Sequence, residues 1–188
     1  MEDFDYEVMW REEKPFADRL ATWTKNVLQP KRVVDLGCGP GMYVTALRDA
    51  GVKAFGYDID ERAKDRLHLG LNHVSMFEVN DPADVVFCIE VAEHISDTLE
   101  SEVVKAIVRN TLPGGTLIWS AAHPGQGGVG HINCRPKSYW HSLLEGVGMR
   151  RDYDREAQMM SWIKSGYHMG WFSMNAMVFV RGLSSDSL

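Results

Sequence analysis

Two kinds of apolar pattern alternate along the chain: short apolar runs, and longer segments with apolar residues at helical spacing. Short apolar runs bounded by glycine, proline or aspartate are typical of strands. The run at 83–90 is apolar at nearly every position, as a strand buried on both faces must be. The predicted strands are Lys31–Leu36, Val52–Tyr57, His73–Phe77, Ala83–Glu90, Gly115–Ala121 and Phe172–Arg181.

The segments between these strands have apolar residues at helical spacing. In the segment after the fourth strand, Leu99, Val103 and Ile107 recur at helical spacing, and Pro113-Gly114 lies just beyond its end. Alternation of strands and helices predicts a parallel sheet covered by helices on both faces. The predicted helices are Phe16–Leu28, Met42–Ala50, Asp60–Leu69, Ser96–Asn110 and Lys137–Glu145.

Length and composition predict one globular domain. The chain has 188 residues, of which 45% are hydrophobic and 24% charged. No repeat or linker divides it. We expect a helical segment at 1–30, two halves at 31–121 and 122–183, and a frayed Ser-rich tail at 184–188.

The charge balance disfavours nucleic acid as a partner. The chain carries 20 Lys and Arg against 26 Asp and Glu, a net charge of −6, whereas proteins that grip phosphate backbones are usually basic. No apolar run is long enough for a membrane span, and the acidic N-terminus is unlike a signal peptide. Three cysteines without a C-x-x-C spacing indicate reduced thiols, so we expect a cytoplasmic location.

A glycine-rich turn follows the first predicted strand, with the sequence Asp35-Leu36-Gly37-Cys38-Gly39-Pro40-Gly41. Glycines let a ligand approach the backbone, and the helix that follows offers free N–H groups. A plain connecting turn is the alternative. A dinucleotide site would need Gly or Ala where Met42 stands, and Asp35 would repel a pyrophosphate. The turn therefore suits a ligand with an ammonium group and no phosphate.

A second acid marks the end of the second predicted strand. Asp58 lies seventeen residues beyond Gly41, where a nucleotide-binding sheet places the carboxylate that accepts the ribose hydroxyls. The alternative is a helix N-cap, a role that we assign to Asp60 instead. Asp35 and Asp58 together imply a ligand with an amino-acid end and a nucleoside end.

These motifs resemble those of class I S-adenosylmethionine-dependent methyltransferases. The resemblance covers about residues 31–121 and implies a Rossmann-like three-layer sandwich with a mostly parallel seven-stranded sheet and an antiparallel last strand. It is carried by the glycine turn at 35–41, the acidic motif Gly56-Tyr57-Asp58, the strand and turn Asp84–Ile95, and the loop and strand Leu112–Leu117.

The resemblance implies S-adenosylmethionine as the cofactor, bound by the half at 31–121, and S-adenosylhomocysteine as the product. In the family the glycine turn wraps the methionine part, residues after the third strand flank the adenine, and the turn after the fourth strand closes over the sulfonium. The cofactor-binding residues it implies are Asp35, Gly37, Cys38, Gly39, Gly41, Asp58, Ile59, Glu78, Val79, Glu90 and Val91.

We therefore expect methyl transfer to an oxygen or nitrogen of a small molecule, with sugars among the candidates. The polar, glycine-rich segment after the fifth strand begins where parallel sheets bind ligands, although it also fits a flexible surface loop. The candidate general bases are His123, His131 and Glu90, followed by His94. The candidate acceptor-binding residues are Gln126, Asn133, Tyr139 and Trp140, with Tyr6 and Trp10 from the N-terminal segment.

Three other functions remain open. Amino-methylating DNA enzymes of this family carry Asn or Asp before Pro-Pro and an aromatic residue, but the segment 89–92 reads Ile-Glu-Val-Ala. RNA methylation is disfavoured by the acidic net charge and because we expect no room for a separate recognition domain in 188 residues. A non-catalytic module that binds S-adenosylmethionine would not need the polar segment after Ala122, and nicotinamide-dependent oxidoreduction is opposed by Asp35 and Met42.

The histidines show no metal-binding spacing along the sequence. His94, His123, His131 and His168 form neither H-x-x-x-H nor H-E-x-x-H. We therefore expect no metal site, and the default role of His94 is a hydrogen-bonded structural histidine.

Overall fold

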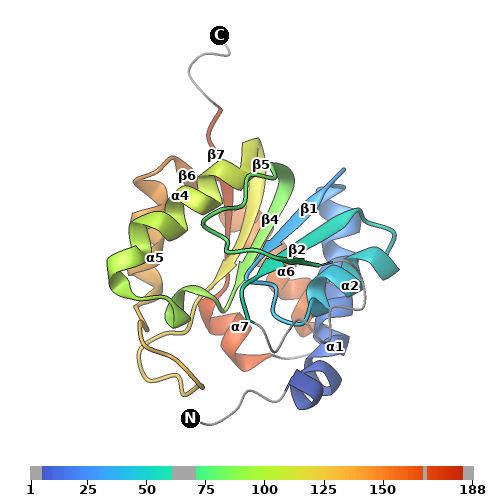
Figure 1. Cartoon of the computed structure of the whole chain (residues 1–188). Coiled ribbons are helices and arrows are strands. Elements are labelled where there is room, and N and C mark those ends of the chain that lie inside the picture. Colours follow the sequence, from blue (N-terminus) through green and yellow to red (C-terminus); the bar gives the residue numbers. More distant parts are fainter. Residues whose placement is uncertain (1–5, 61–70, 167–168, 184–188) are drawn as a thin grey trace.

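A seven-stranded sheet runs through the centre of the molecule (Figure 1). The computed structural model describes residues 6–60, 71–166 and 169–183. The strand order is β3-β2-β1-β4-β5-β7-β6. The strands are β1 (Val33–Leu36), β2 (Ala54–Asp58), β3 (Asn72–His73), β4 (Ala83–Ile89), β5 (Thr111–Ser120), β6 (Met149–Arg151) and β7 (Met177–Arg181).

Strand direction creates a site for ligands at one edge of the sheet. β1 pairs in parallel with both β2 and β4, so successive strands are added on one side of β1 and then on the other. In open α/β sheets, ligands bind beyond the carboxyl ends of the strands at this switch point. β7 runs antiparallel to both β5 and β6, and the predicted fold class is confirmed.

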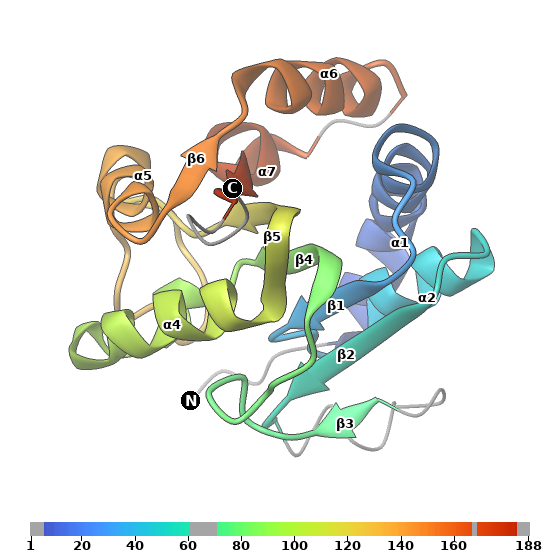
Figure 2. The same cartoon turned by 90° about the horizontal axis from the view of Figure 1, so that it is seen from above.

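Helices cover both faces of the sheet, which gives three layers (Figure 2). Buried residues of α1, α2, α6 and α7 form one core cluster with the sheet, and those of α4 and α5 form the other. The helices are α1 (Tyr6–Trp23, continued by a π-helix at Thr24–Leu28), α2 (Met42–Asp49), α4 (Glu100–Asn110), α5 (Lys137–Glu145), α6 (Tyr153–Lys164) and α7 (Gly170–Asn175), with 3₁₀ turns at Ala92–His94 and Asp97–Leu99.

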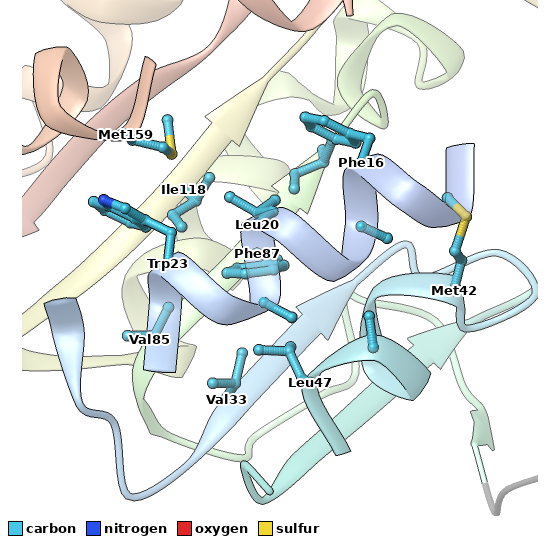
Figure 3. Close-up of a cluster of buried hydrophobic side chains, with 14 of the residues drawn as sticks. Phe16, Leu20, Trp23, Val33, Met42, Leu47, Val85, Phe87, Ile118 and Met159 are labelled. Carbon is cyan, nitrogen blue, oxygen red and sulfur yellow. The ribbon is translucent and has the colours of Figure 1, made fainter. Parts of the chain in front are cut away.

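The period of two in the strands divides the core between the two faces. Val33 faces the cluster under α1 and α2, which Figure 3 shows, and Val34 faces the cluster under α4 and α5. Phe87 and Cys88 on β4 repeat this division. Every residue of β1 is buried, because helices cover both sides of the strand.

Several predicted boundaries differ from the structure. The third strand ends at His73, and the segment after it turns instead, with Phe77 N–H donating to Ser75 Oγ at 3.3 Å. The last strand begins at Met177, because Phe172 belongs to α7 and packs in the first core cluster. β6, α6 and α7 were not predicted. Most of the predicted helix at 60–69, the tail at 184–188 and His168 lie outside the described residues.

Trp140 belongs to the core, which contradicts the expectation that it binds the acceptor. Its side chain is 1% exposed and packs against Trp119 on β5, with ring centroids 5.3 Å apart. Helical periodicity explains the difference, since α5 turns Trp140 and Leu144 inward together. Across the described ranges, no helix is long and apolar enough to cross a membrane.

Trp140→Ala is expected to lower the free energy of unfolding by about 3–5 kcal/mol, because it opens a cavity under α5. Tyr153→Ala, which truncates a ring that is 60% exposed and stacks on Arg151, should cost no more than about 1 kcal/mol. Urea denaturation of both variants measures the difference. Equal small losses would show that Trp140 is not a core residue.

Candidate functional site

The glycine turn wraps the carboxyl end of β2. Gly37, Gly39 and Gly41 have φ angles of 78°, 50° and 78°, a region of backbone conformation that residues with a Cβ rarely adopt. The N–H groups of Gly37 and Cys38 both donate to the carbonyl of Tyr57, at 2.8 and 3.2 Å. Cys38 is buried against Gly56, where a Cβ would lie 2.7 Å from its Sγ, so the thiol fills space between the turn and β2.

Asp35 is a buried carboxylate that lacks a full set of partners. Its side chain is 1% exposed, and Oδ2 has no hydrogen-bond partner among the described residues. Burial raises the pKa of Asp35 to about 8, and the nearby charge of Asp58 adds to the effect. A cation bound here would favour the charged form of Asp35, whereas an anion would be repelled.

Asp58 lies at the end of β2 and fixes the turn. Its Oδ2 accepts a hydrogen bond from Gly39 N–H at 2.7 Å, and its Oδ1 accepts one from Asp60 N–H at 2.8 Å. Each carboxylate oxygen has two lone pairs, so both still have room for a hydroxyl donor. Ile59 beside it is 63% exposed and offers an apolar surface.

Glu78 and Val79, which the resemblance places beside the adenine, differ in exposure. Glu78 is exposed. Val79 is buried in the second core cluster, and its carbonyl accepts hydrogen bonds from Arg109 Nε at 2.7 Å and Asn110 Nδ2 at 3.0 Å. The side chain and carbonyl of Val79 are thus engaged with the core and α4, which leaves Glu78 as the accessible member of the pair.

The turn after β4 closes over the glycine turn. Val91 packs so tightly on Gly37 that a Cβ on the glycine would come within 2.5 Å of Val91 Cγ2. Glu90 adopts a left-handed conformation with φ of 53°, which costs a non-glycine residue free energy and is typical of functional sites. Its N–H donates to the carbonyl of Ser120 at 3.0 Å, which ties the turn to the end of β5.

Two amides hold the Glu90 carboxylate. Gln126 Nε2 donates to Oε2 at 2.8 Å, and Asn175 Nδ2 donates to Oε1 at 3.2 Å. Asn175 Nδ2 also lies 2.7 Å from Gln126 Oε1, so the three side chains form a closed network. The network joins the turn after β4, the loop after β5 and α7.

Helices α1 and α2 bring two further polar groups that the sequence did not indicate. Burial raises the pKa of Glu13 to about 7, and the charge of Glu90 adds to it. Tyr43 on α2 is partly buried, and its pKa is raised well above 10 by burial and then by the charges of Glu13, Asp35 and Glu90. Only tertiary packing places these groups together, since 77 residues separate Glu13 from Glu90.

The predicted acceptor residues fall into two groups. His123, Gln126 and His131 lie on the loop after β5, partly buried, with His123 Nδ1 2.9 Å from the carbonyl of Pro124. Asn133 and Tyr139 instead bond Glu100 on α4, through Asn133 Nδ2 at 2.9 Å and through the Tyr139 hydroxyl. These two side chains fasten the loop to α4, a role that sequence spacing does not show.

The N-terminal candidates are only partly defined. Trp10 is half-buried and packs against the first core cluster. Tyr6 begins α1, and its side chain lies outside the described residues. The first turns of α1 and α7 lie at the same, lower edge of the sheet in Figure 1.

This edge fits the cofactor that the motifs imply. Asp35, Asp58, Glu13 and Glu90 are acids, and no described Lys or Arg forms an ion pair with any of them. S-adenosylmethionine carries an ammonium and a sulfonium but no phosphate, so its charges complement the acids. A Cβ at Gly37 would collide with Val91, so only glycine lets the two turns pack together at this edge.

Comparison with known proteins defines the family. Residues 9–165 match the model of a methyltransferase domain family, and the chain belongs to that family. The resemblance to class I S-adenosylmethionine-dependent methyltransferases is thereby confirmed, and with it the cofactor.

Curated relatives and solved structures agree with this placement. A ubiquinone biosynthesis O-methyltransferase of Neisseria meningitidis is 34% identical over 133 residues, which cover 62% of this chain and 50% of that protein. A Pseudomonas fluorescens protein of the same name is 31% identical over 161 residues, covering 73% of this chain and 64% of that protein. The chain thus spans about half to two thirds of the length of these relatives.

Two solved structures share the fold at low sequence identity. A methyltransferase from Archaeoglobus fulgidus matches with a TM-score of 0.67 and 15% identity, covering 94% of this chain and 100% of that one. A sugar N-methyltransferase from Streptoalloteichus matches with a TM-score of 0.68 and 16% identity, covering 97% and 94%.

Gly37→Val is expected to abolish binding of S-adenosylhomocysteine, because a β-branched side chain at a φ of 78° is strained and collides with Val91, which displaces the glycine turn. Gly127→Ala is the control, since nothing lies within 4 Å of the Cβ that it adds. Titration calorimetry measures both affinities. Unchanged affinity in Gly37→Val would show that this turn does not hold the cofactor.

Proposed function

We propose that this chain transfers the methyl group of S-adenosylmethionine to an oxygen or nitrogen of a small molecule. The observation that carries the proposal is the buried Asp35, which lies beside the glycine turn at the switch point of the sheet. Its unpartnered Oδ2 and raised pKa mark a position for the ammonium of an amino acid.

The remaining cofactor contacts follow from this position. Asp58 accepts the two ribose hydroxyls through its remaining lone pairs, and Ile59 packs on one face of the adenine. Glu78 lies at the adenine edge. The turn that holds Glu90 and Val91 lies over the sulfonium, whose positive charge faces the Glu90 carboxylate.

The acceptor lies between the loop after β5, α7 and the start of α1. Glu13, Glu90, Gln126 and Tyr43 surround this space with acceptors and donors of hydrogen bonds. A polar small molecule with hydroxyl or amino groups suits such a lining better than a phosphate backbone does. The name of the relatives mentions ubiquinone biosynthesis and O-methylation, and that of the Streptoalloteichus neighbour mentions N-methylation of a sugar. We therefore choose phenols and amino sugars as the first acceptors to test.

S-adenosylmethionine supplies an already activated methyl group, so this chain contributes mainly position. Holding two reactants in line can supply on the order of 7–11 kcal/mol. A hydroxyl acceptor also needs a proton acceptor within hydrogen-bond reach. We assign that role to His123 or His131 on the loop, whereas Glu90, with both oxygens held by amides, orients the acceptor.

We place the protein in the cytoplasm with no nucleic-acid partner. The net charge of −6 opposes a phosphate backbone, and Cys38, Cys88 and Cys134 are all free thiols in the structure.

A screen for release of S-adenosylhomocysteine tests the function. The purified chain is incubated with S-adenosylmethionine and with ortho-diphenols, amino sugars, neutral sugars or RNA. Release with a diphenol or a sugar supports the proposal and identifies the acceptor class. Binding of S-adenosylhomocysteine without turnover of any small molecule would favour a non-catalytic module, and turnover of RNA alone would overturn the acceptor assignment.

His123→Ala and His131→Ala are each expected to keep near-normal affinity for S-adenosylhomocysteine and to lose at least about tenfold in kcat with the acceptor found above. His141→Ala on α5 is the matched control and should retain full turnover. Steady-state kinetics with parallel calorimetry separate the two effects. Unchanged turnover in both loop variants would move the acceptor site toward Trp10 and the N-terminal segment.

A further inference from the structure

Glu93, His94 and His131 lie together although the sequence separates them. Each offers one ligand atom, and these atoms all lie within 4.8 Å of one another. Glu93 and His94 belong to the 3₁₀ turn after β4, and His131 belongs to the loop after β5. The proposed function does not use Glu93 and names His94 only as a weak candidate base. It names His131 as an alternative to His123 for the proton acceptor, and a metal ion on His131 leaves that role to His123.

Glu93 is a buried acid, and no described Lys or Arg forms an ion pair with it. Its side chain is fully buried, and neither carboxylate oxygen has a hydrogen-bond partner of good geometry among the described residues. A buried carboxylate without a partner is costly unless a cation or a proton is bound there.

The two histidines are oriented as metal ligands usually are. His94 Nδ1 lies 3.2 Å from the carbonyl of Gly130, and His131 Nδ1 lies 3.4 Å from the carbonyl of Gln126. A ring nitrogen that donates to a backbone carbonyl leaves the other nitrogen, Nε2, with a lone pair for a metal. The rings meet edge to face with centroids 5.0 Å apart.

The loop is built to hold His131 in this place. The N–H groups of Ile132 and Asn133 both donate to the carbonyl of Glu93, at 2.8 and 3.0 Å. Gly128 packs under the imidazole, because a Cβ there would come within 2.3 Å of the His131 ring. A flexible surface loop with a solvated histidine would need neither contact.

We propose that Glu93, His94 and His131 bind one divalent transition-metal ion, for which zinc is the best match. Two imidazoles and one carboxylate are a common protein ligand set for zinc, and three protein ligands leave a fourth position open. The proposal replaces the sequence-based expectation of no metal. Sequence spacing missed the site because 37 residues separate the two histidines and only the fold brings them together.

The bound ion lies beside the acceptor space. The backbone carbonyl of Gln126 contacts His131, and its side-chain amide donates to Glu90. Gln126 therefore lies between the ion and the Glu90 network. The open position can take water or an oxygen of the acceptor, and a metal-bound hydroxyl is a stronger acid than a free one. This second role rests on the proposed function, whereas binding of the ion does not.

Cobalt titration tests the site directly. The full chain is stripped of metal with a chelator and titrated with Co²⁺, whose visible absorption reports nitrogen and oxygen ligands in low coordination. We expect one Co²⁺ per chain, displaced by one equivalent of Zn²⁺, and a rise in Tm with Zn²⁺. His131→Ala and Glu93→Gln should each weaken binding at least about tenfold.

His141→Ala is the matched control for the metal site. His141 Nε2 lies 3.2 Å from Glu145 Oε1, so it forms a histidine–carboxylate pair without a third ligand in the described part of the chain. Its loss should leave Co²⁺ affinity unchanged. His131 lies on a partly exposed loop, so this variant tests the site even if Glu93→Gln fails to fold.

Two results would overturn the metal site. One is the absence of Co²⁺ and Zn²⁺ binding by the wild-type chain, and the other is equal affinity in the wild type and His131→Ala. Calorimetry with S-adenosylhomocysteine on the same samples separates the two proposals. Cofactor binding without metal removes only the metal site, and metal binding without the cofactor removes only the proposed function.

Discussion

The burial of Asp35 is the constraint around which the site is organised. β1 lies between two parallel strands with helices on both faces, so its last residues cannot reach solvent. A carboxylate in that position without a cation is unfavourable and takes up a proton, which its raised pKa reflects. A ligand that brings a positive charge into the glycine turn removes this cost, and the same position rejects phosphate.

The other acids extend the same electrostatic character across the edge. Asp58 limits the site on the β2 side, and Glu90 limits it on the β4 side in a strained backbone conformation. The amides of Gln126 and Asn175 fix Glu90 without neutralising it, so its charge remains available to a ligand. Within the described residues these acids have no ion-pair partners, which is costly for the protein alone and fits a cationic cofactor.

Local sequence patterns predict where the residues of the cofactor-binding half lie, but they do not predict which residues meet on the acceptor side. The glycine turn, Asp58 and β4 are each encoded within a few neighbouring residues, so their positions could be predicted. Glu13 and Asn175 reach the site only through the packing of α1 and α7, and no local signal marks them. Trp140 was expected at the acceptor site because a short apolar segment does not reveal which face its helix buries, and Phe172 was assigned to a strand because a short apolar run does not distinguish strand from helix. Sequence spacing also does not show that His94 and His131 lie together, because their approach depends on a loop that folds back on a turn.

The most direct test of the account is the proton released when the cofactor product binds. With a pKa of about 8, Asp35 is mostly protonated at pH 7, and an adjacent ammonium lowers that pKa, so binding expels the proton and affinity rises as the pH increases from about 6 to 8. Calorimetry of S-adenosylhomocysteine binding at pH 7, in buffers of different ionisation enthalpy, measures the number of protons released. The account predicts release of about one proton by the wild type and almost none by Asp35→Asn, whose affinity is also lower. Binding without proton release, or with equal release in both proteins, would contradict it.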